Sequence, residues 1–350
     1  MRPVEVVGGG LAGLALGCRL RDLGVPVTLF ARGTYPRHRT CGEFIHGADP
    51  RIFDALGLSG LLDDAQRRWS VRWHQAGAPP RQWRLAQPAL VISRHELDAR
   101  LAREFEARGG SLRIGRSISS VEAPEGRVFA HGRHGDTRSP WLGLNLHLRG
   151  VRLPADLEFH VGRRAYLGLC ALDGGRVNLC GLFHRELAAS THGLDGIRSR
   201  LEAADLQAIA ARLAGATEIE GSACAVAGLR FGLQPCTEGL AAIGDAFAFT
   251  PPYTGRGMGL AFASAACAAG PLATWSRGAS SWDRAREEIR RRQLLLHRRG
   301  LPRARGLHRF LLAPRAARAA ALLLRAGLLP LRQLTTFLNP PHPHPCFSTL

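Results

Sequence analysis

The sequence predicts an α/β protein in which a Rossmann-like parallel sheet is interwoven with an antiparallel sheet and followed by a basic helical region. A β-branched strand pattern over residues 4–7 enters a glycine-rich turn near the beginning of the 350-residue chain, and a small-residue helix and a second strand follow. Four strand patterns at close spacing lie between residues 141 and 183. Arginine and leucine dominate the chain beyond residue 277.

The glycine-rich turn has the spacing Gly-x-Gly-x-x-Gly, formed by Gly8, Gly10 and Gly13 around Leu11 and Ala12. This order of strand, turn and helix is typical of a dinucleotide-binding βαβ unit. Gly8 permits the tight turn, Gly10 lets backbone N–H groups approach a pyrophosphate, and Gly13 lets the helix pack closely on the strand. We therefore predict that these five residues bind a nucleotide pyrophosphate at the positive end of the helix.

The second strand, residues 25–30, is followed by Ala31 and Arg32 instead of the acidic residue that usually binds the adenosine ribose. Arg32 suits two roles. It could stack on adenine, or it could hold the 2′-phosphate of a nicotinamide cofactor. The residues leave both interpretations open.

The middle of the chain reads mainly as strands. A hairpin pattern covers residues 69–75 and 81–85, and a strand over 89–94 leads to a helix that Ser93 caps. The further strands that we expect are residues 111–114, 118–122, 127–130, 142–148, 157–161, 166–172, 176–182 and 226–233, with a helix over 194–214.

A second glycine-rich helix start follows an apolar strand that ends in Gly244 and Asp245. The loop after them contains Gly255, Gly257 and Met258, where another helix begins. Two such starts suit one elongated cofactor, because each helix N-terminus meets a different part of it. Asp245 is placed to accept hydrogen bonds from a sugar or sugar-alcohol chain between them.

Composition limits the partners and the location. The net charge is +19, and residues 277–332 hold 15 arginines against three acidic residues. Such a region attracts an acidic carrier protein or an anionic membrane surface. No nucleic-acid-binding motif accompanies it, so we predict no nucleic-acid partner. Residues 257–276 are too rich in Ala, Gly and Ser for a membrane span, and the turn of adjacent glycines interrupts any signal peptide. We expect a cytoplasmic protein, peripheral at the membrane if the basic region binds lipid.

We predict no metal site. The eight cysteines are scattered without a C-x-x-C pair, which disfavours structural zinc and a secreted disulfide framework. His342, His344 and Cys346 stand together near the C-terminus, but they lie among prolines and lack a fourth ligand.

Taken together, the motifs resemble the FAD-dependent oxidoreductase superfamily of aromatic-ring hydroxylases and geranylgeranyl reductases over most of residues 1–275. The turn from Gly8 to Gly13 is similar to the family's FAD pyrophosphate site. The resemblance implies that Arg39, Cys41 and Gly42 lie in a loop near the flavin and that Arg94 approaches the cofactor. It implies that Asp245 binds the ribityl chain, and that Gly244, Gly255, Gly257 and Met258 belong to the second FAD motif.

Three departures from the family pattern bear on activity. Ala31 replaces the ribose-binding glutamate. Residues 130–133 stand where the hydroxylases carry an Asp-Gly motif linked to FAD and NADPH, which puts direct reduction by NADPH in question. Arg256 adds a positive charge that we expect near the flavin.

The resemblance implies an FAD-dependent oxidoreductase that acts on a hydrophobic lipid-, isoprenoid- or polyketide-like molecule by hydride transfer at a C=C bond. One alternative is an FAD-dependent monooxygenase that hydroxylates or epoxidises such a substrate, and a second is an NADP-binding reductase without flavin. NADPH or NADH is the expected transient electron donor. Cys41 is the candidate catalytic residue, and His46, Trp73, Tyr166 and Tyr253 are candidate pocket residues.

The expected organisation divides the chain into four parts. A discontinuous FAD-binding domain takes residues 1–68, 86–140 and 234–276. A substrate domain takes 69–85 and 141–233, a basic helical C-terminal region takes 277–338, and a flexible tail takes 339–350.

Overall fold

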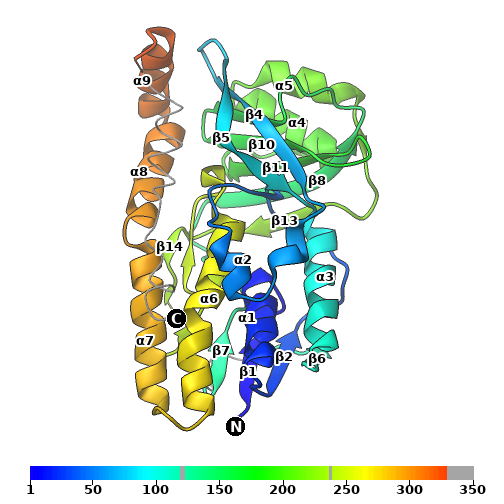
Figure 1. Ribbon diagram of the computed structural model, residues 1–350. Coiled ribbons are helices and arrows are strands. Elements are labelled where there is room, and N and C mark those ends of the chain that lie inside the picture. Colours follow the sequence, from blue (N-terminus) through cyan, green and yellow to red (C-terminus); the bar gives the residue numbers. More distant parts are fainter. Residues whose placement is uncertain (119–122, 236–238, 329–350) are drawn as a thin grey trace.

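The computed structural model describes residues 1–118, 123–235 and 239–328. The expected strand at 118–122 falls almost wholly outside the described residues, as do the expected tail and its His342, His344 and Cys346. The described chain forms a lower layer around a parallel sheet, an upper layer around a second sheet, and a column of helices along one side (Figure 1).

The parallel sheet has the strand order β15-β7-β1-β2-β6 within the described residues. Its strands are β1 (Val4–Val7), β2 (Val27–Ala31), β6 (Ser111–Ile114), β7 (Arg127–Phe129) and β15 (Ala241–Ala242). The helices α1 (Leu11–Asp22) and α3 (Arg94–Ala107) pack on it, and α6 (Gly257–Ser276) packs on α1. Because the strands are parallel, the segments that leave β1, β7 and β15 emerge at the same edge of the sheet. That edge carries both glycine-rich motifs.

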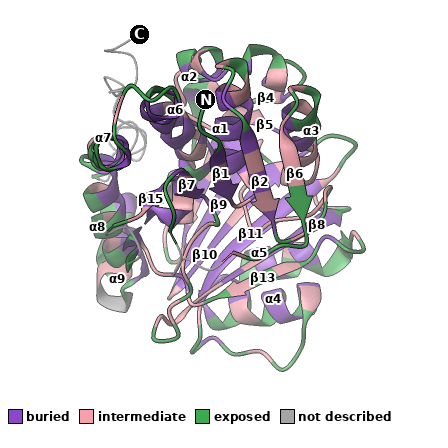
Figure 2. Ribbon diagram, turned by 90° about the horizontal axis from the view of Figure 1, so that it is seen from below, coloured by how far each residue is buried: buried purple, intermediate pink, exposed green. Residues whose placement is uncertain are grey.

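The second sheet has the order β12-β8-β11-β10-β9-β4-β5-β3 among the described residues, with β13 also paired to β8. Its strands are β3 (Phe44–Ile45), β4 (Gln66–Gln75), β5 (Arg81–Val91), β8 (Trp141–Arg149), β9 (Leu157–Gly162), β10 (Ala165–Ala171), β11 (Val177–His184), β12 (Thr217–Glu218) and β13 (Cys224–Ala227). Figure 2 shows its central strands buried beneath α4 and α5.

Helices cover the outer surfaces. The remaining helices are α2 (Arg51–Ala55), α4 (Gly193–Ala203), α5 (Gln207–Arg212), α7 (Trp282–His297), α8 (Gly300–Leu312) and α9 (Pro314–Arg325). Short 3-10 turns are η1 (Ser59–Leu62), η2 (Leu213–Gly215), η4 (Gly244–Ala246) and η5 (Pro252–Thr254), and β14 (Gly232–Leu233) pairs with β16 (Ala248–Phe249). The helices α7, α8 and α9 form the column that runs past both layers (Figure 1).

The predicted fold class is confirmed, with one correction to the second sheet. The sheet is mixed, because β4 runs parallel to β9 with Val71 opposite Leu157. The two strands are far apart in the sequence, so no tight turn fixes their relative direction, whereas β8 to β11 follow one another as antiparallel neighbours.

Several predicted boundaries also shift. The strand expected at 89–94 is the end of β5, so the expected domain boundary at 85/86 falls inside one strand. The helix expected at 194–214 is broken between α4 and α5, where Asp205 adopts a positive φ of 63°. The strand expected at 226–233 is divided by Gly228, whose φ is 70°. In both cases a residue with a positive φ interrupts the helix or strand, although the pattern of side chains predicts that it continues.

The described residues include one helix, Gly257–Ser276, that is long and apolar enough to cross a membrane, and 67% of its most apolar window is buried inside the protein. It packs against α1 and α7 as a core helix.

Candidate functional site

The first glycine-rich turn has the geometry that its spacing predicts. Gly8 has a φ of 125°, and a Cβ atom there would lie 2.2 Å from the carbonyl oxygen of Ala130. A Cβ atom on Gly13 would lie 2.0 Å from the carbonyl oxygen of Gly8. By contrast, a Cβ atom on Gly10 would meet nothing within 4 Å. Gly8 and Gly13 therefore serve packing, whereas Gly10 faces open space in front of α1.

The second motif lies directly against the first. A Cβ atom on Gly244, whose φ is 59°, would lie 2.9 Å from the Cβ of Ala12 in the first turn of α1. The amide of Gly244 donates to the hydroxyl of the buried Ser264 at 2.6 Å, which anchors the turn to α6. A Cβ atom on Gly257, at the start of α6, would again meet nothing within 4 Å. The two predicted motifs thus form one site.

Both helix starts lack a side-chain cap. No side chain accepts a hydrogen bond from the first turn of α1 or of α6 among the described residues. Uncapped N-terminal amides carry a partial positive charge and are open to an anionic or polar group. Leu11, Ala12 and Met258 have buried side chains, so what they offer a ligand is backbone.

Asp245 stands between the two helix starts as a carboxylate without a partner. It makes no hydrogen bond or ion pair with any residue that the structure describes. Burial raises its pKa, and the positive charges of Arg133 and Arg94 oppose that rise. The side chain is half-buried, so a donor that reaches its carboxylate would satisfy an acceptor that the protein leaves open. Hydroxyl groups of a sugar-alcohol chain are donors of the required kind.

The loop before β3 closes over the first turn. The hydroxyl of Tyr35 donates to the carbonyl oxygen of Gly9 at 2.6 Å, and Arg39 donates to the same oxygen at 3.2 Å. Arg39 also pairs with the buried Asp98 at 3.3 Å. Arg39 is therefore part of the framework that holds the turn, and its approach to a flavin stays a prediction.

Arg94 and Cys41 lie next to each other in the same region. The guanidinium of Arg94 pairs with Asp98 at 2.7 Å and contacts the Cys41 thiol. Burial raises the pKa of that thiol, although Arg94 opposes the rise. The thiol is therefore protonated at neutral pH. The backbone of Cys41 is fixed by Asn145, which accepts from its amide at 3.2 Å, and by Asn178, which donates to its carbonyl at 2.8 Å.

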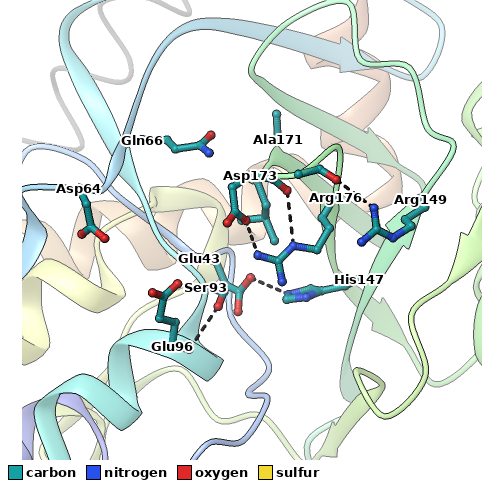
Figure 3. A network of polar contacts seen from close by, with 12 residues as sticks. Glu43, Asp64, Gln66, Ser93, Glu96, His147, Arg149, Ala171, Asp173 and Arg176 are labelled. Carbon is teal, nitrogen blue, oxygen red and sulfur yellow. Dashed lines mark hydrogen bonds and ion pairs between the residues drawn. The ribbon is translucent and has the colours of Figure 1, made fainter. Parts of the chain in front are cut away.

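A buried hydrogen-bonded pair, Glu43 and His147, holds this loop to the second sheet. The carboxylate of Glu43 lies 2.7 Å from Nε2 of His147 and accepts the backbone amide of Arg94 at 2.8 Å. Figure 3 shows Glu43 between His147 and the start of the helix that carries Ser93. Glu43 is fully buried and has a positive φ of 58°, so these contacts maintain an unfavourable backbone conformation.

The other predicted residues are distributed as follows. Arg32 is exposed just beyond β2. Gly255, with a φ of 65°, packs on Phe44, and Gly42 packs on the same ring. Arg256 does not face the site as expected: it is buried, and its guanidinium points to Gly300 at the start of α8. The guanidinium of Arg256 has room beside α8 because Gly300 has no side chain, and its position there turns it away from the two motifs.

Three of the four candidate pocket residues meet in one aromatic cluster, together with Phe44 and Phe159. The Tyr166 ring lies 5.6 Å from Tyr253 and 6.0 Å from Phe159, and Trp73 contacts Phe159 as well. His46 makes no ring contact with this cluster among the described residues. The cluster belongs to one buried core between the second sheet and the helices α8 and α9.

Four residues that sequence reasoning did not select belong to the site: Glu43, Asp98, Arg133 and His147. Glu43 follows the predicted Gly42 and Asp98 stands one helical turn after Arg94, so their acidic character was a usable signal. Arg133 lies in the segment 130–133 that departs from the family pattern, but neither its residue type nor that of His147 indicates a place beside the two motifs, because the packing of the sheets brings both there.

One group of described residues, His74, Glu158 and His160, places three potential metal ligands within 4.8 Å of one another. The two imidazole rings stack in parallel at 4.2 Å, so their lone pairs do not converge on one point. Arg212 already pairs with the carboxylate of Glu158. The group is a neutralised polar cluster on the face toward α5, and the absence of a metal site stays a prediction.

No family model matches the sequence. Among curated proteins, the chain is 28% identical over 189 residues to the 3-amino-4-hydroxybenzoate 2-monooxygenase PtmB3 of Streptomyces platensis. The match covers 49% of this chain and 46% of that relative. The chain therefore matches a little under half of the length of the curated protein.

Solved structures of flavoproteins superpose on almost the whole chain. The flavin-dependent brominase Bmp2 has a TM-score of 0.73 at 17% identity, covering 97% of this chain and 93% of its own. The myxobacterial chondrochloren halogenase CndH has a TM-score of 0.69 at 19% identity, covering 97% and 95%. PqsL of P. aeruginosa has a TM-score of 0.68 at 17% identity, covering 92% and 99%. The chain has the fold of flavin-dependent halogenases, and the predicted resemblance to FAD-dependent oxidoreductases is confirmed at the level of the fold.

Proposed function

We propose that the chain binds FAD along the edge of the parallel sheet and uses it as an oxidoreductase. The observation that carries this proposal is the contact between the two glycine-rich motifs, where Gly244 packs on Ala12. Open space lies before Gly10 and before Gly257, so the chain leaves room where an elongated nucleotide would pass. The residues present therefore fit the cofactor.

Each part of the site has a role in this proposal. The amides at the start of α1 bind the pyrophosphate, and Asp245 accepts hydrogen bonds from the ribityl hydroxyls. The start of α6 stabilises negative charge on the flavin end through its partial positive charge. Arg32 is exposed and makes no hydrogen bond or ion pair with a described residue, so it is free to contact the adenosine portion.

We infer that the reaction is monooxygenation more than hydride transfer at a C=C bond. The support is the similarity to a monooxygenase over 189 residues, together with the halogenase fold that covers 97% of the chain. When bound, FAD supplies electron transfer and oxygen activation. The buried aromatic cluster around Tyr166 and Tyr253 makes the region between the second sheet and α8 apolar, which suits a hydrophobic small molecule and excludes water.

Cys41 acts in this proposal as a packed, neutral thiol. Burial raises its pKa, so it neither attacks a substrate nor carries charge at neutral pH. Glu43 and His147 are positioning residues, because they hold the Cys41 loop without facing the open space before α1 or α6.

The purified protein decides between the reactions. We expect a yellow protein with flavin absorbance that consumes oxygen when NADPH or NADH and an aromatic test substrate are added, and incorporates one ¹⁸O atom from ¹⁸O₂ into the product. Reduction of a C=C bond without oxygen consumption would support hydride transfer instead. A colourless protein that binds NADPH would support the flavin-free reductase and overturn the proposal.

Asp245→Asn is the matched variant for the cofactor. It retains shape and removes the charge, so we expect weaker FAD binding with an unchanged fold. The partners of the basic region, an acidic carrier protein or an anionic membrane surface, stay a prediction. In that region Glu288 pairs with Arg291 and Arg292, and Asp283 pairs with Arg286, which leaves most of the arginines in excess.

A further inference from the structure

A surface pocket of about 260 Å³ lies where α8 meets the start of β8 and the segment 229–231 that follows β13. We call it the α8 pocket. Its walls include three ring side chains and three arginines, which are Trp141, Phe231, His308, Arg230, Arg305 and Arg309. None of them belongs to the cofactor motifs.

The rings form one continuous apolar wall. His308 lies 4.8 Å from the Trp141 ring and 4.7 Å from the Phe231 ring. His308 is nine-tenths buried, and its Nδ1 atom has no hydrogen-bond partner within the described chain. Burial lowers its pKa to about 4, so the ring is neutral at pH 7 and leaves the wall uncharged. A planar ring would find stacking surface here on the half-buried Trp141 and Phe231 rings.

Arg305 and Arg309 supply charge that no carboxylate of the described residues pairs with, whereas the charge of Arg230 acts on Asp136. The side chains of Arg230, Arg305 and Arg309 make no hydrogen bond or ion pair with any described residue. The one carboxylate that lines the pocket, Asp136, accepts the backbone amide of Arg138 at 3.0 Å and pairs with its side chain. The pocket is therefore positive overall, and guanidinium groups bind carboxylate and phosphate oxygens well.

We propose that the α8 pocket binds a planar aromatic anion, with the ring against Trp141 and Phe231 and the anionic group against Arg305 and Arg309. The volume suits one or two fused rings, since a cavity of about 150 Å³ holds benzene. This chemistry has two sources: a free aromatic acid, or the ring and phosphate of a nicotinamide dinucleotide.

The pocket also has a physical connection to the cofactor site. The His308 ring stacks on Tyr253 at 6.0 Å, and the Tyr253 hydroxyl donates to the carbonyl oxygen of Ala304 in α8 at 2.8 Å. Tyr253 stands in η5, a few residues before the start of α6. A ligand in the α8 pocket therefore lies one aromatic layer from the loop that leads into α6.

The test is calorimetric titration of the full-length protein with 2-naphthoate and with its neutral isostere 2-naphthamide. We expect 2-naphthoate to bind about tenfold more tightly, since a charge-assisted contact is worth about 1.4 kcal/mol or more. Arg305→Gln and Arg309→Gln should each weaken naphthoate binding about threefold to tenfold and leave naphthamide unchanged. Both arginines are exposed, so these variants are expected to fold, which a thermal melt verifies.

Arg290→Gln is the matched control, because Arg290 is an exposed arginine of α7 that is not part of the pocket wall. Equal affinity for the acid and the amide, an equal loss in the Arg290 variant, or no binding of naphthoate up to about 1 mM each overturns the proposal. Competition between NADPH and naphthoate identifies the dinucleotide as the source, and its absence identifies a free aromatic acid. Flavin absorbance of the same samples reports separately on the proposed function.

Discussion

Gly10 and Gly13 are three residues apart in one turn, yet the structure gives them opposite sensitivities to the same substitution. A methyl group on Gly13 would lie 2.0 Å from a backbone carbonyl oxygen, whereas one on Gly10 meets no atom within 4 Å. Gly10 has φ −104° and ψ −173°, which alanine adopts freely. Gly10→Ala therefore affects only what occupies the open space.

We expect Gly10→Ala to weaken FAD binding about tenfold to a hundredfold, because a methyl group there displaces one charge-assisted amide–phosphate contact of about 1.5–3 kcal/mol. The folded apoprotein should lose only about 0.5–1 kcal/mol for the poorer helix N-cap, a shift in Tm of roughly 1–4 °C. Gly13→Ala should instead destabilise the apoprotein by roughly 3 kcal/mol or more, since a backbone oxygen cannot move aside.

In the assay, each apoprotein is titrated with FAD, and the quenching of flavin fluorescence reports binding. A thermal melt without flavin measures the stability of the same apoprotein. The reasoning is refuted if Gly10→Ala binds FAD as tightly as the unchanged protein, because the space in front of α1 would then be unrelated to the cofactor. It is equally refuted by a Gly13→Ala apoprotein that melts at the original temperature.

Three further predictions concern titrating and buried groups. Asp245→Asn should raise the free energy of unfolding of the apoprotein at pH 7, because burial raises the pKa of this carboxyl and its ionised form therefore opposes folding. Denaturant titrations should show that this increase in unfolding free energy vanishes below pH 3.8. Glu43→Ala should lower the free energy of unfolding by roughly 3–5 kcal/mol, because His147 and the amide of Arg94 lose a buried partner. A loss of less than about 1 kcal/mol in urea unfolding contradicts this prediction. Burial lowers the pKa of His308 from 6.5 to about 4. Its contribution of roughly 3 kcal/mol to the free energy of unfolding is therefore complete above pH 6.5 and is lost as the pH falls toward 4. His308→Phe should flatten that part of the curve of unfolding free energy against pH.

Much of the candidate site could be read from short stretches of sequence. Gly8, Gly10 and Gly13 follow one strand, and Gly244 and Asp245 follow another, so parallel strands bring both to one edge. The same reasoning does not reach Arg133 or His147. Glu43 and His147 are 104 residues apart, and only the docking of β8 against the loop before β3 brings them into contact.

The direction of side chains is a second limit of the sequence. Arg256 stands beside two motif glycines and looks like a charge for the cofactor, but its guanidinium turns into the space that Gly300 leaves at the start of α8. Likewise, the strand pattern of residues 69–75 does not reveal that β4 pairs in parallel with β9, which makes the second sheet mixed.

The sequence by itself determined the parallel sheet, the two glycine-rich helix starts and the basic helical region, because turn chemistry and strand or helix periodicity act over a few residues. The tertiary structure alone decided which distant groups meet: Asp245 with Arg133, Glu43 with His147, and the ring wall of the α8 pocket with its arginines. Those contacts depend on how the two sheets and the helical column pack, which is a property of the whole chain and of no local segment.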